Sequence, residues 1–597
     1  PSRPSGAHPT NAVGGSFIRG LQVRAQLALE SHQRSWWIVH TQPNSTLGCT
    51  FRLIKLGLDM KDPPTALVGL HLNSCVTDFF SSLLDWGVPM KLQACAILTI
   101  CSLAVATQTV GLQVKPDVTG TRKAGEIVLE PASLSTPETG ALNFELGTLY
   151  VPENRADPKS RIIGVGFARF RAPQPTTAPP QFHLPGGPGD SYLRGLKQDN
   201  RQLARWIKSI NIYRRVGDVV FVDQRGNSER GEILKLKYRT PDQPLDQPTS
   251  LARATAAFVE GARAAVAEYE KKGIDLRGYT VKECADDVND LRRALGYDRI
   301  TLVGTSFGSQ WSFAVMRRHP EVIARALLSG VEPLDYGYDM PSHVFAAVQR
   351  MWWEAEKDPR LKPYLPRGGL MTAAREVFRR LDRGAVQVRL SDTVTVTVGR
   401  EDFQRDFPRG ANGPAFLLSL YYERYVAWVL PLTIARRSRE VETVLIGPLI
   451  DTSLGVTPKR EHLLRTDAGT EFLGQWNFDS YLATADIWPT ADVGDEFRNE
   501  VVCRIPVVFA QGDWDTSTPV ENTLNVAHYF LNGRVLIAEH GGHGVLDPIA
   551  DHLPEVMSVL LEFLKTGNTA NVPARVSLPV PKFLAPDFPL PASKPKA

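Results

Sequence analysis

The sequence has little net charge, few cysteines and no apolar run long enough to span a membrane. Its 597 residues include 68 basic and 64 acidic side chains, which leaves a formal net charge of +4. No stretch resembles a polybasic arm, so charge does not favour a nucleic-acid partner. The apolar run at 92–106 is too short for a transmembrane helix, and we expect no stable membrane span. With 43% apolar and 22% charged residues, the composition is that of a folded globular protein.

Cysteine is scarce in most of the chain. Four of the six cysteines lie within the first 101 residues, which leaves Cys284 and Cys503 far apart in the sequence. Neither has metal-type spacing, and no other ligand cluster appears, so we expect no metal and no cofactor. Sequence separation alone does not decide whether these two cysteines pair. We favour two buried free thiols.

The first part of the chain differs from the rest. Residues 1–89 show little sustained period of 2 or 3.6. Met90-Lys91 then precedes an apolar run, 92–106, that ends in an A-x-A sequence, which is the pattern of a signal peptide. We therefore interpret 90–106 as a signal peptide and 1–89 as an untranslated leader or a non-native extension. The mature chain would begin near Thr107 and be secreted or periplasmic.

Two alternatives exist for this region. One is a genuine N-terminal domain with a short buried helix at 92–106. The other is a lipoprotein signal, which is disfavoured because Ile100 precedes Cys101 at a place that requires a small residue.

Strands and helices alternate along most of the remaining chain. We expect strands at 144–151, 161–170, 181–184, 218–222, 299–303, 324–329, 505–510 and 534–538. We expect helices at 251–271, 281–295, 307–318 and 553–565. Strands that alternate with helices predict a mostly parallel sheet covered by helices on both faces.

Residues 341–490 interrupt this alternation. The segment is rich in aromatic residues and its apolar pattern is mainly helical, as at 416–430. We interpret it as a helical cap inserted into the sheet domain, although core packing explains any single aromatic residue. The expected division is a first core part at 107–340, the cap at 341–490, a second core part at 491–570 and a Pro-rich tail at 571–597. We expect this tail to be extended along the surface or loose.

Gly304-Thr305-Ser306-Phe307-Gly308 fits the G-x-S-x-G pattern. A predicted strand precedes it and a predicted helix follows it, as in the nucleophile elbow of α/β-hydrolases. Side chains two residues before and after a serine on such a tight turn would collide, which explains the glycines. The helix N-terminus also favours negative charge that develops during reaction. We therefore expect Ser306 to be a nucleophile.

A nucleophilic serine needs a base that is itself oriented by a carboxylate. In α/β-hydrolases these follow in the order Ser, Asp or Glu, then His. Asp513 and Asp515 compete for the acid, and Asp515 is favoured because its spacing to 518–519 matches G-x-x-D-x-x-T-P. His543 lies between glycines and is favoured as the base over His540. Activity should then rise with pH as the imidazole becomes neutral.

An oxyanion hole requires two preorganised N–H groups. One should come from Phe307, directly after the nucleophile. The second should come from the loop at 183–189, where Pro188 has no N–H and Gly186 allows close approach. Gly187 is therefore the expected donor.

Several short motifs together resemble the prolyl aminopeptidase and tripeptidyl aminopeptidase family of serine exopeptidases. They are GGPG at 186–189, DQRG at 223–226, GTSFG at 304–308, SGVEP at 329–333, GDWDTSTP at 512–519 and GGHG at 541–544. The opening ELGTLYVPEN at 145–154 and Pro185 before GGPG are similar to the tripeptidyl branch. The resemblance implies an α/β-hydrolase fold and release of N-terminal residues or short peptides. We expect Arg225 of DQRG to hold loops by hydrogen bonds.

An aminopeptidase must bind a free α-ammonium group, which carboxylates do best. Glu332, Glu423 and Asp190 are the candidates, although each can equally be an ordinary exposed or paired carboxylate.

Other functions remain open on this scaffold. A carboxylesterase acting on a small ester is the main alternative, because fold and triad do not define the substrate. A catalytically inactive binding protein is a third, and the retained serine, aspartate, histidine and glycines argue against it. Hydrolases of this fold with an aspartate nucleophile are excluded, because the elbow carries Ser306.

Overall fold

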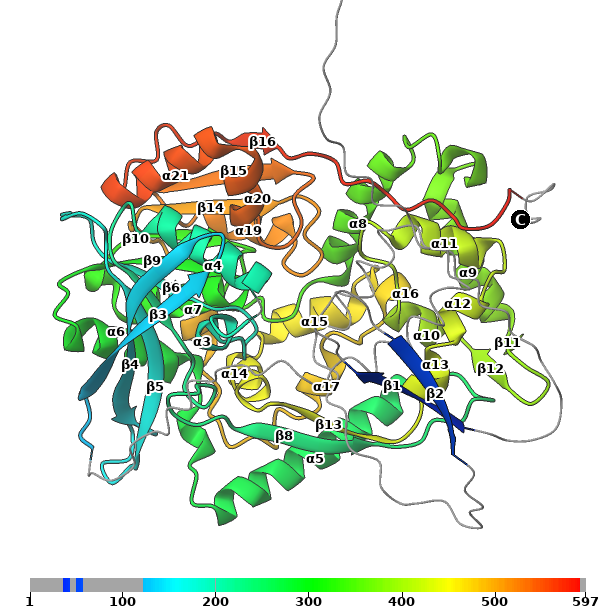
Figure 1. The fold of residues 1–597 in the computed structure, drawn as a ribbon, viewed down its shortest axis with the longest axis horizontal. Coiled ribbons are helices and arrows are strands. Elements are labelled where there is room, and N and C mark those ends of the chain that lie inside the picture. The colour runs from blue at the N-terminus through cyan, green and yellow to red at the C-terminus, as the bar shows by residue number, and fades with distance from the viewer. Residues whose placement is uncertain (1–35, 43–49, 57–121, 199, 591–597) are drawn as a thin grey trace, which may run out of the picture. The chain divides into compact units, whose positions relative to one another are not determined.

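A computed structural model describes residues 36–42, 50–56, 122–198 and 200–590 (Figure 1). The chain divides into two compact units, 1–113 and 114–597. In the first unit, β1 (Trp36–Gln42) pairs antiparallel with β2 (Thr50–Leu56). The predicted signal peptide at 90–106 lies outside the described residues, so it stays a prediction.

The second unit is built on a ten-stranded sheet. Its strand order is β16-β15-β14-β10-β9-β6-β7-β5-β4-β3. All pairs from β16 to β7 are parallel, and β7, β5, β4 and β3 pair antiparallel. The strands are β3 (Ile127–Thr136), β4 (Gly140–Pro152), β5 (Ile162–Phe170), β6 (Gln181–Leu184), β7 (Val219–Val222), β9 (Ile300–Thr305), β10 (Ile323–Ser329), β14 (Val507–Gly512), β15 (Gly533–Glu539) and β16 (Arg575–Ser577). The mostly parallel sheet predicted from the sequence is confirmed.

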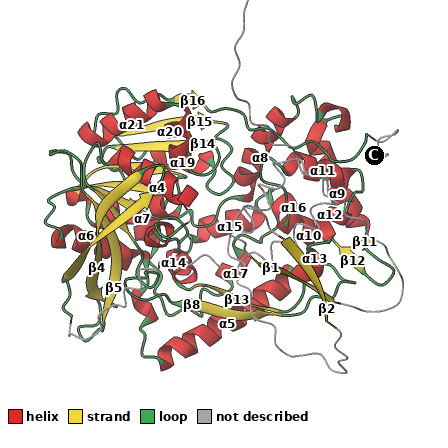
Figure 2. Cartoon of the chain, viewed as in Figure 1, coloured by secondary structure: helices red, strands yellow, loops and turns green. Residues whose placement is uncertain are grey.

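Helices cover both faces of this sheet, as Figure 2 shows. Consecutive strand side chains point to opposite faces, so Val220 and Val222 enter one apolar core while Val219 and Phe221 enter another. The first core is shared with α5 (Leu251–Lys271), α6 (Val281–Ala294), α7 (Phe307–Arg318), α14 (Ile446–Leu454) and α19 (Val520–Ala527). The second core is shared with α3 (Tyr192–Gly195), α4 (Asn200–Tyr213), α20 (Leu546–His552) and α21 (Pro554–Thr566).

The segment between β10 and β14 forms most of a separate apolar core, to which Trp514 and Phe583 also belong. Its elements are mainly short helices: α8 (Pro341–Ala355), α9 (Gly369–Arg383), α10 (Arg400–Arg405), α11 (Gly413–Tyr421), α12 (Val426–Val429), α13 (Leu432–Ala435), α15 (Pro458–Thr466), α16 (Thr470–Leu473) and α17 (Asp479–Leu482), with the hairpin β11 (Val386–Arg389) and β12 (Thr395–Val398). Two features cross the expected cap boundary. Helix α14 packs into the sheet core, and β13 (Arg439–Val444) pairs with β8 (Lys235–Thr240), which precedes the cap in sequence.

The mainly helical pattern at 416–430 forms two helices with a break between them. Helix α11 ends at Tyr421, and Glu423 has a φ of 61°. A right-handed helix cannot continue through a left-handed residue, so the chain turns before α12 begins at Val426.

The described part of the Pro-rich tail, up to residue 590, is held against the protein rather than loose. Strand β16 pairs with β15, after which the tail runs toward α8 and α11 (Figure 1). Phe583 is buried in the cap core, where its ring lies 6.2 Å from that of Trp514. Arg360 donates a 2.8 Å hydrogen bond to the Phe583 carbonyl, and the Tyr364 hydroxyl donates a 2.7 Å bond to the Phe588 carbonyl. The tail therefore ties the sheet domain to the cap.

Two further expectations concern cysteines and membranes. Cys284 is buried and Cys503 is partly exposed, and both are free thiols. The expectation of two free thiols is therefore confirmed. The expectation that both are buried is confirmed for Cys284 and wrong for Cys503. No helix within the described ranges is both long and apolar enough to cross a membrane.

Replacing Phe583 with alanine should destabilise the protein. We expect the free energy of unfolding to fall by about 3 kcal/mol, because a buried aromatic ring leaves a cavity when it is removed. Urea unfolding followed by tryptophan fluorescence would measure this change. Val580 on the same tail is 45% exposed, and its alanine variant should differ from the native protein by less than about 0.5 kcal/mol. Equal effects of the two substitutions would show that the tail does not stabilise the fold.

Candidate active site

Ser306 occupies the sharp turn between β9 and α7. Its φ of 59° and ψ of −134° are strained values for a residue with a side chain. Its N–H donates to the carbonyls of Ser329 at 3.0 Å and Gly330 at 3.1 Å, both at the end of β10. These bonds hold the strained turn against the neighbouring strand.

The two glycines of the elbow are required by packing. A Cβ atom on Gly304 would come within 2.2 Å of the Gly308 carbonyl oxygen. A Cβ atom on Gly308 would come within 2.1 Å of the Leu184 carbonyl oxygen. Any larger residue at either position would therefore displace the turn that carries Ser306.

Asp515 follows β14 and is fully buried. One of its oxygens accepts from the N–H groups of Ser517 and Thr518, both at 2.9 Å. The other accepts from the Thr518 hydroxyl at 2.8 Å and from the Gln511 amide at 3.0 Å. Burial alone would raise the pKa of this carboxyl, but its bond to His543 and these donors hold the pKa below the ordinary 3.8.

His543 follows β15 and lies beside Asp515, with Nδ1 3.0 Å from Oδ2. Burial alone would lower the pKa of His543, but the hydrogen bond and charge of Asp515 raise it above 6.5. The two rival residues make other contacts. His540 Nδ1 lies 2.9 Å from the Leu578 carbonyl, and the Asp513 carboxylate accepts from the His540 N–H at 2.7 Å.

Ser306 and His543 both lie next to Gly330. The Gly330 carbonyl accepts from the Ser306 N–H, while a Cβ atom on Gly330 would come 2.9 Å from His543 Cε1. In the described part of the chain, no hydrogen bond joins the Ser306 hydroxyl to the imidazole. Such bonds are often long before a substrate is bound. The structure thus brings Asp515 and His543 together next to the elbow.

The two expected oxyanion donors also lie at the elbow. Phe307 is the first residue of α7, so its N–H has no partner within the helix. Gly186 packs against the nucleophile, since its Cβ position is 3.3 Å from Ser306 Cβ. Gly187 follows with a φ of +108°, a conformation that side chains rarely adopt. Among the described residues, neither the Phe307 nor the Gly187 N–H has an acceptor.

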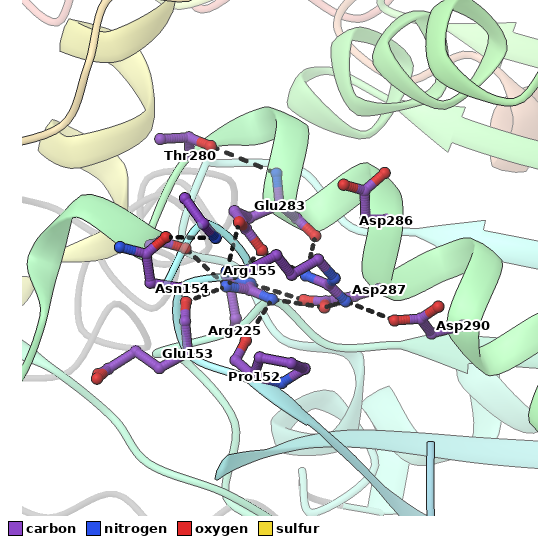
Figure 3. A network of polar contacts seen from close by, with 12 residues as sticks. Pro152, Glu153, Asn154, Arg155, Arg225, Thr280, Glu283, Asp286, Asp287 and Asp290 are labelled. Atoms are coloured by element: carbon purple, nitrogen blue, oxygen red, sulfur yellow. Dashed lines mark hydrogen bonds and ion pairs between the residues drawn. The ribbon is translucent and has the colours of Figure 1, made fainter. Parts of the chain in front are cut away.

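Arg225 does hold loops together, as expected. It is fully buried and forms two hydrogen bonds with Asp287, at 2.7 and 2.6 Å. It also donates to the carbonyls of Glu153 and Gly278 at 2.6 Å each. Arg155 pairs with the same Asp287 from the other side, which completes the network in Figure 3.

Glu332 lies near the site and has a buried carboxyl group. Its N–H donates to the Ser309 hydroxyl, which in turn donates to the Ser306 carbonyl. Burial, and then the charges of Asp339, Asp451 and Asp515, raise the pKa of Glu332 well above 4.5. Burial also raises the pKa of Asp339 to about 7 and that of Asp451 to about 8.

The other two candidate carboxylates differ in position. Asp190 is exposed at the end of the 186–190 loop, and its charge contributes to the raised pKa of His543. Glu423 has a side chain that is 64% exposed and lies 3.6 Å from Arg380. Within the described ranges nothing connects Glu423 with Ser306 or His543, so its selection as a substrate-binding residue is not supported.

The sequence did not identify three residues that complete the site. Gln511 donates to Asp515 and also accepts from the Val331 N–H at 2.8 Å. It therefore connects the loop after β14 with the loop after β10. Asp339 and Asp451 complete the acidic group around Glu332. Gln511 directly precedes the GDWDTSTP motif, which was the one available signal. Asp339 and Asp451 carried none, because they lie in segments without a motif.

Structure comparison matches the chain to solved structures with diverse names, at TM-scores too low to carry an argument about fold or activity. A thermophilic esterase from Thermogutta terrifontis is 14% identical over 70% of this chain and 98% of its own, with a TM-score of 0.28. An epoxide hydrolase from hot-environment metagenomes is 14% identical over 74% and 100%, with a TM-score of 0.28. A bromoperoxidase from Bacillus anthracis is 16% identical over 70% and 99%, with a TM-score of 0.29. Their activities are not transferred to this chain at such values.

Sequence comparison gives a firmer result for the family. No curated protein sequence matches the chain. The family model described as the alpha/beta hydrolase fold matches residues 184–548, which is more than half of the chain and spans positions 306, 515 and 543. Together with the mostly parallel sheet and its elbow, this match shows that the chain belongs to the α/β-hydrolase family.

Proposed function

We propose that the chain is a serine hydrolase that releases N-terminal residues or short peptides from peptide substrates. The observation that carries the first half of this proposal is the contact between His543 and Asp515 beside the strained Ser306. His543 removes the proton of Ser306 as its oxygen attacks the scissile carbonyl. The N–H groups of Phe307 and Gly187 stabilise the oxyanion, and His543 protonates the leaving amine. Water then repeats the sequence on the acyl-enzyme.

The acidic group around Glu332 supports an amine-bearing substrate. In the described part of the chain, no Lys or Arg nitrogen lies within 4 Å of the carboxylates of Glu332, Asp339 or Asp451. Arg460, whose charge acts on Asp339, is instead stacked 3.8 Å from the Tyr336 ring. Buried carboxylates without a cation are costly. Their raised pKa values favour the protonated, neutral form, and a bound substrate α-ammonium group would favour the charged carboxylates instead.

The proposal extends to the prolyl and tripeptidyl aminopeptidase family. Its support is the set of motifs at 186–189, 223–226, 304–308, 512–519 and 541–544. A carboxylesterase is the second candidate function. A neutral ester carries no positive charge, so an esterase would give the carboxyls of Glu332, Asp339 and Asp451 no role in substrate binding. The aminopeptidase is therefore preferred.

A substrate panel separates these two functions. We expect the full chain to hydrolyse tripeptidyl and aminoacyl p-nitroanilides with a free amine, and to lose this activity by at least about 10³-fold in Ser306→Ala. p-Nitrophenyl esters of neutral acids serve as the competing substrates. Ester turnover without amide turnover would favour the esterase instead.

The pH profile tests the base. Because Asp515 raises the pKa of His543 above 6.5, kcat/KM should rise with pH through a value above 6.5 as the imidazole loses its proton. Asp515→Asn removes the negative charge that raises the pKa of His543, while burial, which lowers this pKa, remains. The rise of kcat/KM should therefore move to lower pH, and kcat should fall by about 10⁴-fold. His540→Ala is the matched control and should leave the profile unchanged. A flat profile between pH 5 and 8 is incompatible with His543 as the base.

Glu332→Gln tests recognition of the amine. A charge-assisted hydrogen bond contributes about 1.5–3 kcal/mol, so KM for free-amine substrates should rise roughly 10- to 100-fold. Turnover of a p-nitrophenyl ester should change little. Glu423→Gln, on an exposed residue of the same type, should leave both unchanged. A similar loss on ester and amine substrates would assign Glu332 a purely structural role.

A further inference from the structure

The loop that carries Gly187 does not support its own conformation. Between Gly186 and Asp190 it contains one internal backbone hydrogen bond, of 3.3 Å, within the described residues. Gly187 and Gly189 both have positive φ values, of 108° and 112°. Such a short glycine-rich loop has many accessible conformations. Pro185 and Pro188 restrict part of this backbone, and contacts with other segments hold the glycine positions.

The side chain of Gln224 provides the central contacts. Its Oε1 accepts from the Gly189 N–H at 3.0 Å. Its Nε2 lies 3.2 Å from the Gly186 carbonyl and 3.4 Å from the Asp190 carbonyl and donates toward both. One carboxamide thus binds the loop on both sides of Gly187. Among the described residues, the Gly187 N–H itself has no acceptor.

The neighbours of Gln224 hold the remaining parts of the loop. Asn227 donates to the Gly189 carbonyl at 2.7 Å. Asp223 accepts from the Ser191 hydroxyl at 2.9 Å. The loop at 186–191 is therefore bound along its length by 223–227.

The segment that carries Gln224 is itself fixed to the scaffold. Gln224 is fully buried. The next residue, Arg225, is the centre of the buried network in Figure 3, where it binds Asp287 and two backbone carbonyls. The Arg225 guanidinium cannot leave this network cheaply, because an unpaired buried charge is costly. Gln224 is therefore held in a fixed position, and its hydrogen bonds hold the Gly187 loop relative to the scaffold.

We propose that Gln224 is a positioning residue that sets the Gly187 N–H for oxyanion stabilisation, and this rests on the proposed acyl-transfer function. Donors of an oxyanion hole act only within a narrow distance range of the developing charge. A displacement of about 1 Å in such a group costs about 100-fold in rate. The amide of Gln224 is matched to this role, because both acceptor and donor atoms are needed to hold the loop from two sides.

Gln224→Glu tests this assignment. The variant keeps the shape and the acceptor for Gly189 but places a carboxylate oxygen against the carbonyls of Gly186 and Asp190. We expect kcat to fall roughly 10- to 100-fold with KM within about threefold, for both a tripeptidyl p-nitroanilide and p-nitrophenyl acetate. The rate of Ser306 labelling by a fluorophosphonate should fall in parallel, because it forms a similar tetrahedral centre.

The pH dependence of Gln224→Glu distinguishes the positioning role from a purely structural one, because a purely structural role predicts no change of the effect with pH. A protonated Glu side chain can again donate one hydrogen bond to the loop. The ratio of variant to native kcat should therefore rise as pH falls, measured at each pH on the same substrate. A ratio that is independent of pH argues against the lost donor as the cause.

Gln181→Glu is the matched control. Gln181 is also fully buried, and its Nε2 donates to the Tyr213 carbonyl at 3.0 Å at the opposite end of β6. This variant suffers the same chemical change and should keep native kcat per folded molecule. If both variants lose kcat equally, or if folded Gln224→Glu retains native kcat, the proposal is overturned. Gln224→Met, which removes both contacts without adding charge, replaces the first variant if that one does not fold.

Failure of the proposed function would be recognised separately. Ser306→Ala with undiminished turnover and undiminished labelling would overturn acyl transfer at Ser306, and with it the role of Gln224. Complete loss in Ser306→Ala together with a native Gln224→Glu overturns the positioning role alone. Loss in both, with the Gln181 control active, supports both proposals.

Discussion

The parallel pairing of β6, β9, β10, β14 and β15 is the constraint on which the site depends. Neighbouring strands lie about 4.8 Å apart, and parallel strands end at the same edge of a sheet. The loops after β6, β9, β14 and β15 therefore meet at one edge. They carry, in order, Gly187, Ser306, Asp515 and His543, although about 360 positions separate the first residue from the last.

Buried charge is treated in two different ways in this molecule. In the scaffold it is compensated: Arg225 and Asp287 neutralise each other, and backbone carbonyls complete the guanidinium contacts. Asp515 likewise accepts from four donors besides the imidazole in the site. Beside the elbow, no Lys or Arg nitrogen among the described residues lies within 4 Å of the carboxyls of Glu332, Asp339 or Asp451. The charges of Arg460 and Arg409 reach Asp339 only from farther away. This contrast is the main physical reason to assign the acidic group to substrate binding rather than to stability.

The cap is attached to the sheet domain by more than its two chain connections. Strand β13 pairs with β8, α14 packs into the sheet core, and the tail lays Phe583 against Trp514, directly before Asp515. Each of these contacts limits movement of the cap relative to the catalytic edge. Gly187, Ser306, Asp515 and His543 all lie on loops of the sheet domain, whereas Asp451 of the acidic group lies in the cap, on α14. Limited movement of the cap keeps Asp451 in place relative to them.

Local patterns were sufficient for the elements that are apolar and regular on their own. The strand at 300–305 and the helix at 307–318 were predicted almost to the residue, because a buried parallel strand is a short continuous apolar run and the G-x-S-x-G pattern marks the turn at which the helix begins. The candidate serine, aspartate and histidine were also identified from motif and order, since their spacing to strands and turns is local. Tertiary contacts decided the rest. The break at Glu423, the ordered tail and the amide contacts of Gln224 and Gln511 all depend on residues far away in sequence. The residue at one position does not indicate which distant carbonyl group or ring it will contact. Only the tertiary structure could therefore reveal these contacts.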